Sequence, residues 1–299
     1  ENLISLEQAG IGAIILKSLF EEQIRYEIAT KTNETEQLYL YPEANDYIKN
    51  YARTHHIEEY LNLIEQAKKT LSVPVIASIN CISNEEWTSF AKQIEKAKAD
   101  ALEINIFILP SDTNLDCTKA EQIHFDIIRS VKKEINIPIA IKISNYFSGL
   151  TKFITKLSWE GINGIVLFNR SYMPDIDIDN FKIIPANNLS NPEDISTSLR
   201  WVALMYDKIS CDIAASTGIH DGKGAIKQIL AGAKVVQICS TLYKNGFEII
   251  PQMLDEIKNF MIKNNFKTLE DFRGKMCLKN INNPADYERT QFMKYFANI

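Results

Sequence analysis

Hydrophobic stretches that end in a polar residue recur along this chain, and this repetition constrains its fold more than any other feature. Five of them end in a lysine or an asparagine, and a sixth runs into a Ser-Thr-Gly turn. In chain order they are Ile11 to Leu16 before Lys17, Val73 to Ile79 before Asn80, Ala101 to Ile104 before Asn105, Ile137 to Ile141 before Lys142, Gly164 to Phe168 before Asn169, and Asp212 to Ala215 before Ser216-Thr217-Gly218. In a barrel of parallel strands, the carboxyl ends of the strands carry the chemistry. The pattern therefore predicts one ring of polar groups that faces one ligand.

The segments between these stretches have apolar residues at three- and four-residue spacing, which is typical of helices. The helices expected from this spacing are Glu59 to Thr70, Asn84 to Ala99, Lys119 to Glu134, Leu150 to Trp159, Pro192 to Tyr206 with Asn191 as its N-cap, Asp221 to Ala231 and Phe247 to Ile262. The Val/Ile/Ala runs themselves indicate parallel strands that are buried on both faces. With a further run at Ala233 to Ile238 we count seven strands, whereas a closed (β/α)8 barrel needs eight. We expect an α/β fold of this barrel type, with strand one upstream of residue 1, because Leu3 to Ala9 looks like the helix that follows it. An open doubly wound sheet is the alternative.

Three segments are too long for a minimal barrel. Leu19 to His56 is expected to fold over the barrel mouth, and Arg170 to Asn191, with its acidic run at 175–179, to form a solvent-facing hairpin. We assign residues 1–278 to one barrel domain and residues 279–299 to a C-terminal tail. The aromatic residues of that tail suit docking onto the barrel or onto a neighbouring subunit, as in a homodimer.

Composition and charge favour a small-molecule ligand over nucleic acids or membranes as the binding partner. The chain has 299 residues, 45% of them hydrophobic, and a formal net charge of −5, which disfavours general binding of nucleic acids. No apolar segment approaches the roughly 20 residues of a membrane helix. The five cysteines are far apart and show no CxxC spacing, so we expect reduced thiols in a cytoplasmic protein and no metal site.

The last two strands run into turns that suit a phosphate group. Ser216-Thr217-Gly218 follows one strand, and Cys239-Ser240-Thr241 follows the next. The loops after strands seven and eight of such barrels often hold a phosphate through backbone N–H groups and a helix N-terminus. Gly218 would let the backbone approach an anion closely. The alternative is that both turns are ordinary helix caps.

Taken together, these residues resemble the dihydroorotate dehydrogenase family of FMN-dependent barrels, over about residues 13–272. The most specific segments are Gly12-Ala-Ile-Ile-Leu-Lys17-Ser18, Ala77-Ser78-Ile79-Asn80, Ala140-Ile141-Lys142-Ile143-Ser144 and the stretch from Thr217-Gly218 to Val236-Gln237. The resemblance implies an FMN cofactor, an oxidoreductase that acts on a CH–CH group, and a role in pyrimidine biosynthesis.

The resemblance also implies roles for individual residues. Hydride arriving at flavin N5 builds negative charge at N1/O2, which a lysine at the pyrimidine edge would stabilise. The implied flavin-site residues are Lys17, Asn80, Asn105 and Lys142, with Thr217, Gly218, Cys239 and Ser240 at the phosphate. Lys17 would also take part in catalysis, and Asn105 and Asn169 would bind substrate. Snorkelling lysines and loop-capping asparagines are the structural alternative.

The substrate side departs from the family pattern. The family base is a cysteine or serine directly before a proline after strand four, but here Leu109 precedes Pro110. Ser111 stands where the family has an asparagine. Ser111 or Asp112 acting as base for a different substrate is one hypothesis. The others are reduction of an activated C=C bond, an FMN-binding protein without dehydrogenase activity, and a flavin-free isomerase or aldolase acting on a phosphorylated metabolite.

His220, beside the phosphate turn, could donate to the phosphate or face solvent.

Overall fold

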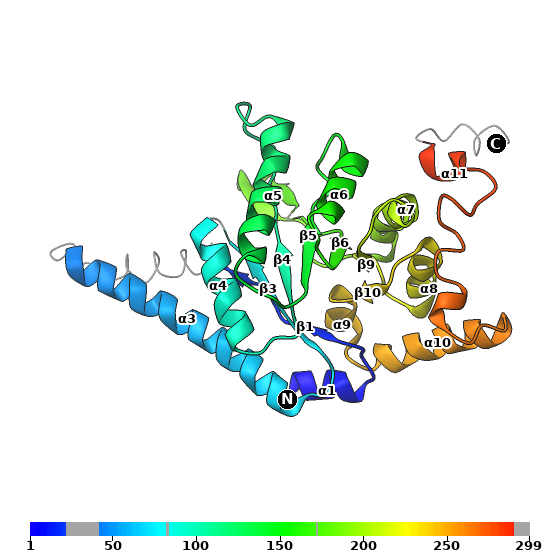
Figure 1. Ribbon diagram of the computed structural model, residues 1–299, viewed down its shortest axis with the longest axis horizontal. Helices are drawn as coiled ribbons and strands as arrows, with labels where there is room; N and C mark the ends of the chain where they lie inside the picture. Colours follow the sequence, from blue (N-terminus) through cyan, green and yellow to red (C-terminus); the bar gives the residue numbers. More distant parts are fainter. Residues whose placement is uncertain (22–41, 82–83, 172, 290–299) are drawn as a thin grey trace. The chain divides into compact units, whose positions relative to one another are not determined.

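A computed structural model describes residues 1–21, 42–81, 84–171 and 173–289 of the chain (Figure 1). The chain divides into two compact units, Glu1–Ile165 and Val166–Ile299, here called the first unit and the second unit.

The first unit is built on parallel strands whose neighbour order follows the chain. Its strands are β1 (Ile14–Ile15), β2 (Leu19–Phe20), β3 (Val75–Asn80), β4 (Ala101–Asn105) and β5 (Ile139–Ile143). The order is β1-β3-β4-β5, and β2 also pairs with β3. A doubly wound sheet reverses its strand order at a switch point, and this part of the sheet does not.

Helices alternate with these strands, and Figure 1 shows α4, α5 and α6 running beside β3, β4 and β5. The helices of the first unit are α1 (Asn2–Gln8), α3 (Pro42–Thr70), α4 (Asn84–Lys96), α5 (Cys117–Lys132) and α6 (Leu150–Trp159). They bury apolar side chains such as Trp87, Phe90 and Phe153 against the sheet. Burial of this kind contributes about 1.5–3 kcal/mol for each large apolar side chain.

One sequence-based boundary was wrong. The segment from Leu19 to His56 was expected to be a loop over the barrel mouth, and the next helix to begin at Glu59. Instead, α3 already begins at Pro42. The stretch from residue 42 to 58 is rich in polar residues and has no continuous apolar stripe, so the periodicity on which the prediction relied is missing there. Residues 22–41, which belong to the same predicted loop, lie outside the described residues.

A buried tyrosine closes the gap between β1 and β2. Both strands pair with β3, but residues 16–18 between them leave the backbone of Ser78 without a strand partner on that side. The Tyr60 hydroxyl accepts from Ser78 N–H at 2.9 Å and donates to Ser78 C=O at 2.9 Å. Burial raises the pKa of the Tyr60 phenol well above its ordinary value. One side chain thus satisfies two buried backbone groups at the point where Lys17 and Ser18 leave the sheet.

The second unit has its own parallel pair and an exposed hairpin. The strand β6 (Gly164–Leu167) crosses the unit boundary, and β9 (Asp212–Ser216) pairs in parallel with β10 (Val235–Gln237). Between them, β7 (Pro174–Asp177) and β8 (Lys182–Pro185) form an antiparallel hairpin. The predicted solvent-facing hairpin is confirmed, since Ile176, Phe181 and Ile183 are all exposed.

The three helical stretches predicted for the second unit begin and end close to the expected residues, and further short helices lie between and after them. The helices of this unit are η2 (Pro192–Asp194), α7 (Ile195–Met205), α8 (Gly222–Ala231), α9 (Ser240–Asn245), α10 (Ile249–Lys263), η3 (Leu269–Asp271) and α11 (Ala285–Glu288). Asn191 and Asp194 form a capping box at the start of η2, with Pro192 at its first position. Phe272 is fully buried between α8 and α10, stacked on Phe266.

Strand–helix alternation with in-order parallel strands confirms the predicted fold class, a (β/α)8 barrel architecture. All seven predicted strands are present among the described residues. The strand expected upstream of residue 1 and the assignment of residues 279–299 as a docking tail stay predictions; residues 290–299 lie outside the described residues. In the parts of the chain that the structure describes, no helix is both long and apolar enough to cross a membrane.

Candidate functional site

Three of the predicted site residues lie side by side at the carboxyl ends of neighbouring strands in the first unit. Asn80 is the last residue of β3, Asn105 is the last of β4, and Lys142 is the next-to-last of β5. Asn105 pairs in register with Lys142, and Asn80 and Asn105 each follow the paired residues Ile79 and Ile104. The strand register therefore brings one ammonium and two amides together.

Lys142 lies within β5, although the sequence pattern predicts it just beyond the end of the strand. The difference matters because a strand residue has a fixed side. Alternate residues of a strand point to the same face, so Ala140 and Lys142 share a face with Glu103 and Asn105 of the neighbouring strand. The Lys142 side chain is 18% exposed, and Asn105 is buried. Lys142 is therefore not a surface lysine that extends its ammonium into solvent.

A buried carboxylate lies beside this row of polar residues. The Glu103 side chain is 3% exposed, and its Oε1 is 3.5 Å from Lys142 Nζ. The Ser78 hydroxyl donates to the same Oε1 at 3.2 Å. Ser78 Oγ is also 2.7 Å from Ser18 Oγ, and since a hydroxyl has one hydrogen, Ser18 is the donor in that pair. Sequence reasoning did not single out Glu103, although a glutamate inside an apolar strand was a signal.

The other residues predicted for catalysis in the first unit are exposed. Lys17 lies in the break between β1 and β2, with its side chain exposed. Ser111 is exposed too, and its N–H donates to the Leu109 carbonyl at 2.8 Å in a tight turn around Pro110. Leu109 itself is 55% exposed. None of these positions shows, by its contacts, how a base would be activated.

Asp112 stabilises its own loop. Its Oδ1 accepts from Asn114 N–H at 2.8 Å and from Asn114 Nδ2 at 3.1 Å. This is an Asx-type turn, in which an aspartate side chain holds a loop of its own backbone. The loop contacts the one after β5 through the rings of Phe107 and Tyr146, whose centroids are 6.3 Å apart. The loop after β4 is thus apolar near the strand and polar only at its far end.

In the second unit, the turn after β9 has the conformation of a strained strand–helix connection. Thr217 and Gly218 both have positive φ values, +76° and +78°. A side-chain carbon added to Gly218 would lie 2.6 Å from Ile195 Cα and 2.7 Å from the Asp194 carbonyl carbon. The glycine is therefore required by the close approach of α7. The predicted reason, access of an anion to the backbone, is not tested by this contact.

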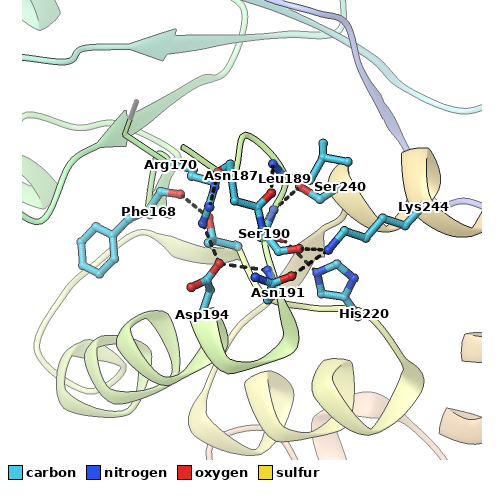
Figure 2. Close-up of polar contacts among 11 residues, drawn as sticks. Phe168, Arg170, Asn187, Leu189, Ser190, Asn191, Asp194, His220, Ser240 and Lys244 are labelled. Carbon is cyan, nitrogen blue, oxygen red and sulfur yellow. Dashed lines mark hydrogen bonds and ion pairs between the residues drawn. The ribbon is translucent and has the colours of Figure 1, made fainter. Parts of the chain in front are cut away.

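Around this turn, loop residues form a polar cluster (Figure 2). His220 contacts Ser190 Oγ through Nε2 at 3.0 Å and Thr241 Oγ1 through Nδ1 at 3.3 Å. Ser240 Oγ accepts from Ser190 N–H at 3.0 Å. Burial, and then the nearby charge of Lys244, lowers the pKa of His220. His220 is thus half-buried and engaged with two hydroxyls, and its predicted role at a phosphate stays a prediction.

Two cations hold the same cluster together. Arg170 Nη1 is 2.6 Å from Asp194 Oδ2, and its Nη2 donates to the Asn187 carbonyl at 2.9 Å. Lys244 Nζ donates to the Ser190 carbonyl at 2.8 Å and to Asn191 Oδ1 at 2.9 Å. Sequence reasoning missed Lys244 and Ser190, since they are 54 residues apart and no motif links them.

The remaining residues predicted for the second unit lie at the ends of its strands. Cys239 is exposed and precedes α9, Ser240 is the first residue of that helix, and Asn169 follows β6 half-buried. Thr217 Oγ1 donates to the Phe168 carbonyl at 3.3 Å. Their assignments to phosphate and substrate stay predictions.

Parallel strands in chain order, with amides and a lysine at their carboxyl ends, are the arrangement of an α/β-barrel enzyme. Comparison with known proteins identifies the family. The family model described as dihydroorotate dehydrogenase matches residues 46–261. The catalytic subunit of dihydroorotate dehydrogenase B (NAD(+)) from Methanocaldococcus jannaschii is 30% identical over 226 residues, covering 73% of each chain. The protein of the same name from Thermoplasma volcanium is 28% identical over 226 residues, covering 72% of this chain and 71% of the relative.

The chain belongs to the dihydroorotate dehydrogenase family. It is an oxidoreductase of dihydroorotate dehydrogenase type, as the family match and these relatives indicate. The predicted resemblance is thereby confirmed.

Proposed function

We propose that this protein is an FMN-dependent oxidoreductase that acts on a CH–CH group, with dihydroorotate or a related cyclic amide as substrate. The observation that carries the proposal is the row formed by Asn80, Asn105 and Lys142 at one edge and on one face of three neighbouring strands. The pyrimidine edge of a flavin presents two carbonyl oxygens and an N–H group. One ammonium and two amides match that set of acceptors and donor.

FMN, when bound, would supply a hydride acceptor whose pyrimidine edge is more negative in the reduced state. In the proposed site, Lys142 supplies the fixed cation that favours this charge, and Asn80 and Asn105 orient the ring. We assign Lys17 to the flavin and substrate side of the same unit. In the second unit, the turns with Thr217, Gly218, Cys239 and Ser240 are proposed for the phosphate. Positive φ values at Thr217 and Gly218 are compatible with a turn that presents backbone N–H groups.

The substrate side calls for a second candidate, an FMN-binding protein without dehydrogenase activity. Leu109 cannot accept a proton, and its side chain is 55% exposed. Ser111 and Asp112 are the nearest replacements in the loop after β4. Asp112 already accepts two hydrogen bonds from Asn114, so one of its carboxylate oxygens is engaged in holding its own loop. A substrate reduced at a C=C bond would need only hydride and a weak acid from this loop.

The relatives named as catalytic subunits of NAD(+)-type enzymes support an electron acceptor reached through a partner chain. We infer that the chain oxidises its substrate in one half-reaction and passes the electrons to such a partner in the other. A role in pyrimidine biosynthesis follows if dihydroorotate is the substrate.

An anaerobic titration tests the proposal. Purified protein loaded with FMN is mixed with dihydroorotate and then with related cyclic amides, while the flavin absorbance in the blue is followed. Bleaching by dihydroorotate supports the dehydrogenase. A bound flavin that no cyclic amide bleaches supports the binding protein, and a protein that takes up no FMN contradicts both. The variants Ser111→Ala and Asp112→Asn identify the base, since unchanged bleaching rates in both exclude that loop.

A further inference from the structure

Glu103 is one of two acidic residues that are buried among the described residues. It lies in β4 between the apolar residues Leu102 and Ile104, where an isolated carboxylate is strongly disfavoured unless it is paired and hydrogen-bonded. The structure supplies both kinds of partner, the Lys142 ammonium at 3.5 Å and the Ser78 hydroxyl at 3.2 Å. A buried pair of this kind needs a reason, because apolar residues of similar volume would serve stability as well.

The geometry directs the lysine. Glu103 pairs in register with Ala140, two residues before Lys142 on the same face of β5. The stem of Lys142 therefore runs from the edge position back toward the neighbouring strand, where its Nζ meets Glu103 Oε1. The distance of 3.5 Å is longer than a strong charge-assisted hydrogen bond. Glu103 thus orients the ammonium without taking up all three of its N–H donors.

The carboxylate is itself held from the opposite side. Ser78 occupies the β3 position that pairs with Glu103, and its hydroxyl accepts from Ser18 while donating to Glu103. The Tyr60 hydroxyl fixes the Ser78 backbone at both N–H and C=O. Three side chains from separate segments, Ser78, Ser18 and Tyr60, therefore hold one carboxylate oxygen beside one ammonium. This degree of preorganisation exceeds what one ion pair needs, and it is what a site requires if its field must not change during a reaction.

We propose that Glu103 is a positioning residue that fixes the Lys142 ammonium at the flavin and, by offsetting part of its charge, lowers the reduction potential of the bound FMN. The inference rests on the proposed function, since it needs a flavin beside Lys142. A cation near N1/O2 favours the reduced, more negative flavin, whereas a carboxylate 3.5 Å from that cation opposes it. Glu103 and Lys142 therefore act on the potential with opposite signs.

The test compares reduction potentials of FMN-loaded variants, measured by anaerobic reduction against a reference dye. In Glu103→Gln, we expect the equilibrium constant for two-electron reduction to rise about tenfold, which corresponds to about 30 mV. In Lys142→Met, the potential is expected to fall. A merely structural role of Glu103 would not produce shifts of opposite sign at the two partners of one pair.

Glu134→Gln is the matched control. It removes the same charge from the first unit, at an exposed carboxylate 2.6 Å from Lys92, and we expect an unchanged potential. Glu103→Asp keeps the charge but withdraws it by one methylene, so the potential is expected between those of the wild type and Glu103→Gln. This variant serves as the test if Glu103→Gln does not fold.

The outcomes separate the inference from the proposed function. If the wild type binds FMN and the potential is the same in Glu103→Gln or Glu103→Asp as in the wild type, the tuning role is overturned and the flavin site stands. If the wild type takes up no FMN at all, the proposed function fails and the tuning role with it.

Discussion

The two units hold their polar clusters in different ways. In the first unit, Ser78, Glu103 and Lys142 are strand residues, and the register of β3, β4 and β5 places them on one face. In the second unit, the cluster around Ser190 and His220 is built from loops and helix ends. In a sheet, alternate residues share a face, and the strand register decides which residues of the next strand lie beside them. A loop cluster depends instead on backbone conformations that no sequence periodicity predicts. A single backbone change should therefore harm the second cluster more.

The largest expected effect is that of Gly218→Ala. A β-carbon at this position meets the backbone of Asp194 and Ile195, and φ is +78°. The left-handed conformation costs about 1–2 kcal/mol for a residue with a side chain, and the clash adds about 1–3 kcal/mol. We expect about 4 kcal/mol of destabilisation, measured by urea unfolding.

Gly246→Ala is the control for that experiment. Its φ is similar, +69°, but an added β-carbon would have nothing within 4 Å. We expect a loss of about 1 kcal/mol there from the backbone conformation alone. Equal losses in the two variants would mean that close packing against α7 does not hold the turn, and the contrast between the units would disappear.

Titration of two histidines sharpens the comparison. His124 in the first unit is fully buried between the rings of Phe147 and Phe153, and burial lowers its pKa from 6.5 to about 4. The folded state then binds fewer protons than the unfolded state between these values. Stability from this group is complete above about pH 6.5 and falls as the pH is lowered toward 4, by about 3 kcal/mol in total.

His124→Asn should remove this dependence. The measurement is the free energy of unfolding as a function of pH between 6.5 and 4, and the slope is expected to flatten in the variant. His220→Asn in the second unit is the comparison, because the pKa of His220 is also lowered but its ring is only half-buried. A smaller change of slope is expected there. A His124→Asn curve parallel to the wild type would contradict the burial argument.

The sequence predicted the strand-held cluster better than the loop-held one, for a physical reason. Apolar runs located β3, β4 and β5 to within two residues, and the polar residue at each end followed directly. The sequence did not predict that Glu103 and Lys142 would pair. Their contact depends on the register between β4 and β5, which is set by the tertiary structure. In the second unit, Ser190 and Lys244 gave no signal, since their contact depends on how the chain after β8 folds back onto α9.

The same reasoning explains the failure at the start of α3. Helix prediction relied on a stripe of apolar residues, and the residues from 42 to 58 offer few of them, so the helix was placed only from Glu59 on. By contrast, the helix start at Asn191 and Pro192 was predicted, because capping is a local interaction between neighbouring residues. Helix caps and periodic apolar patterns could be predicted from the sequence, whereas contacts between loops distant in the chain could not.

The smallest effect we expect concerns the support of the strand-held cluster. Tyr60→Phe removes the hydroxyl that satisfies both Ser78 N–H and Ser78 C=O in the break between β1 and β2. Two buried backbone groups lose a partner, and we expect about 2 kcal/mol of destabilisation by urea unfolding. Tyr287→Phe is the control, since its hydroxyl donates to Met276 C=O at an exposed position and should contribute about 0.5 kcal/mol. If both variants lost the same stability, Ser78 would be held by the strands alone. The cluster beside Lys142 would then need no help from α3, and the register of three strands would be sufficient to form it.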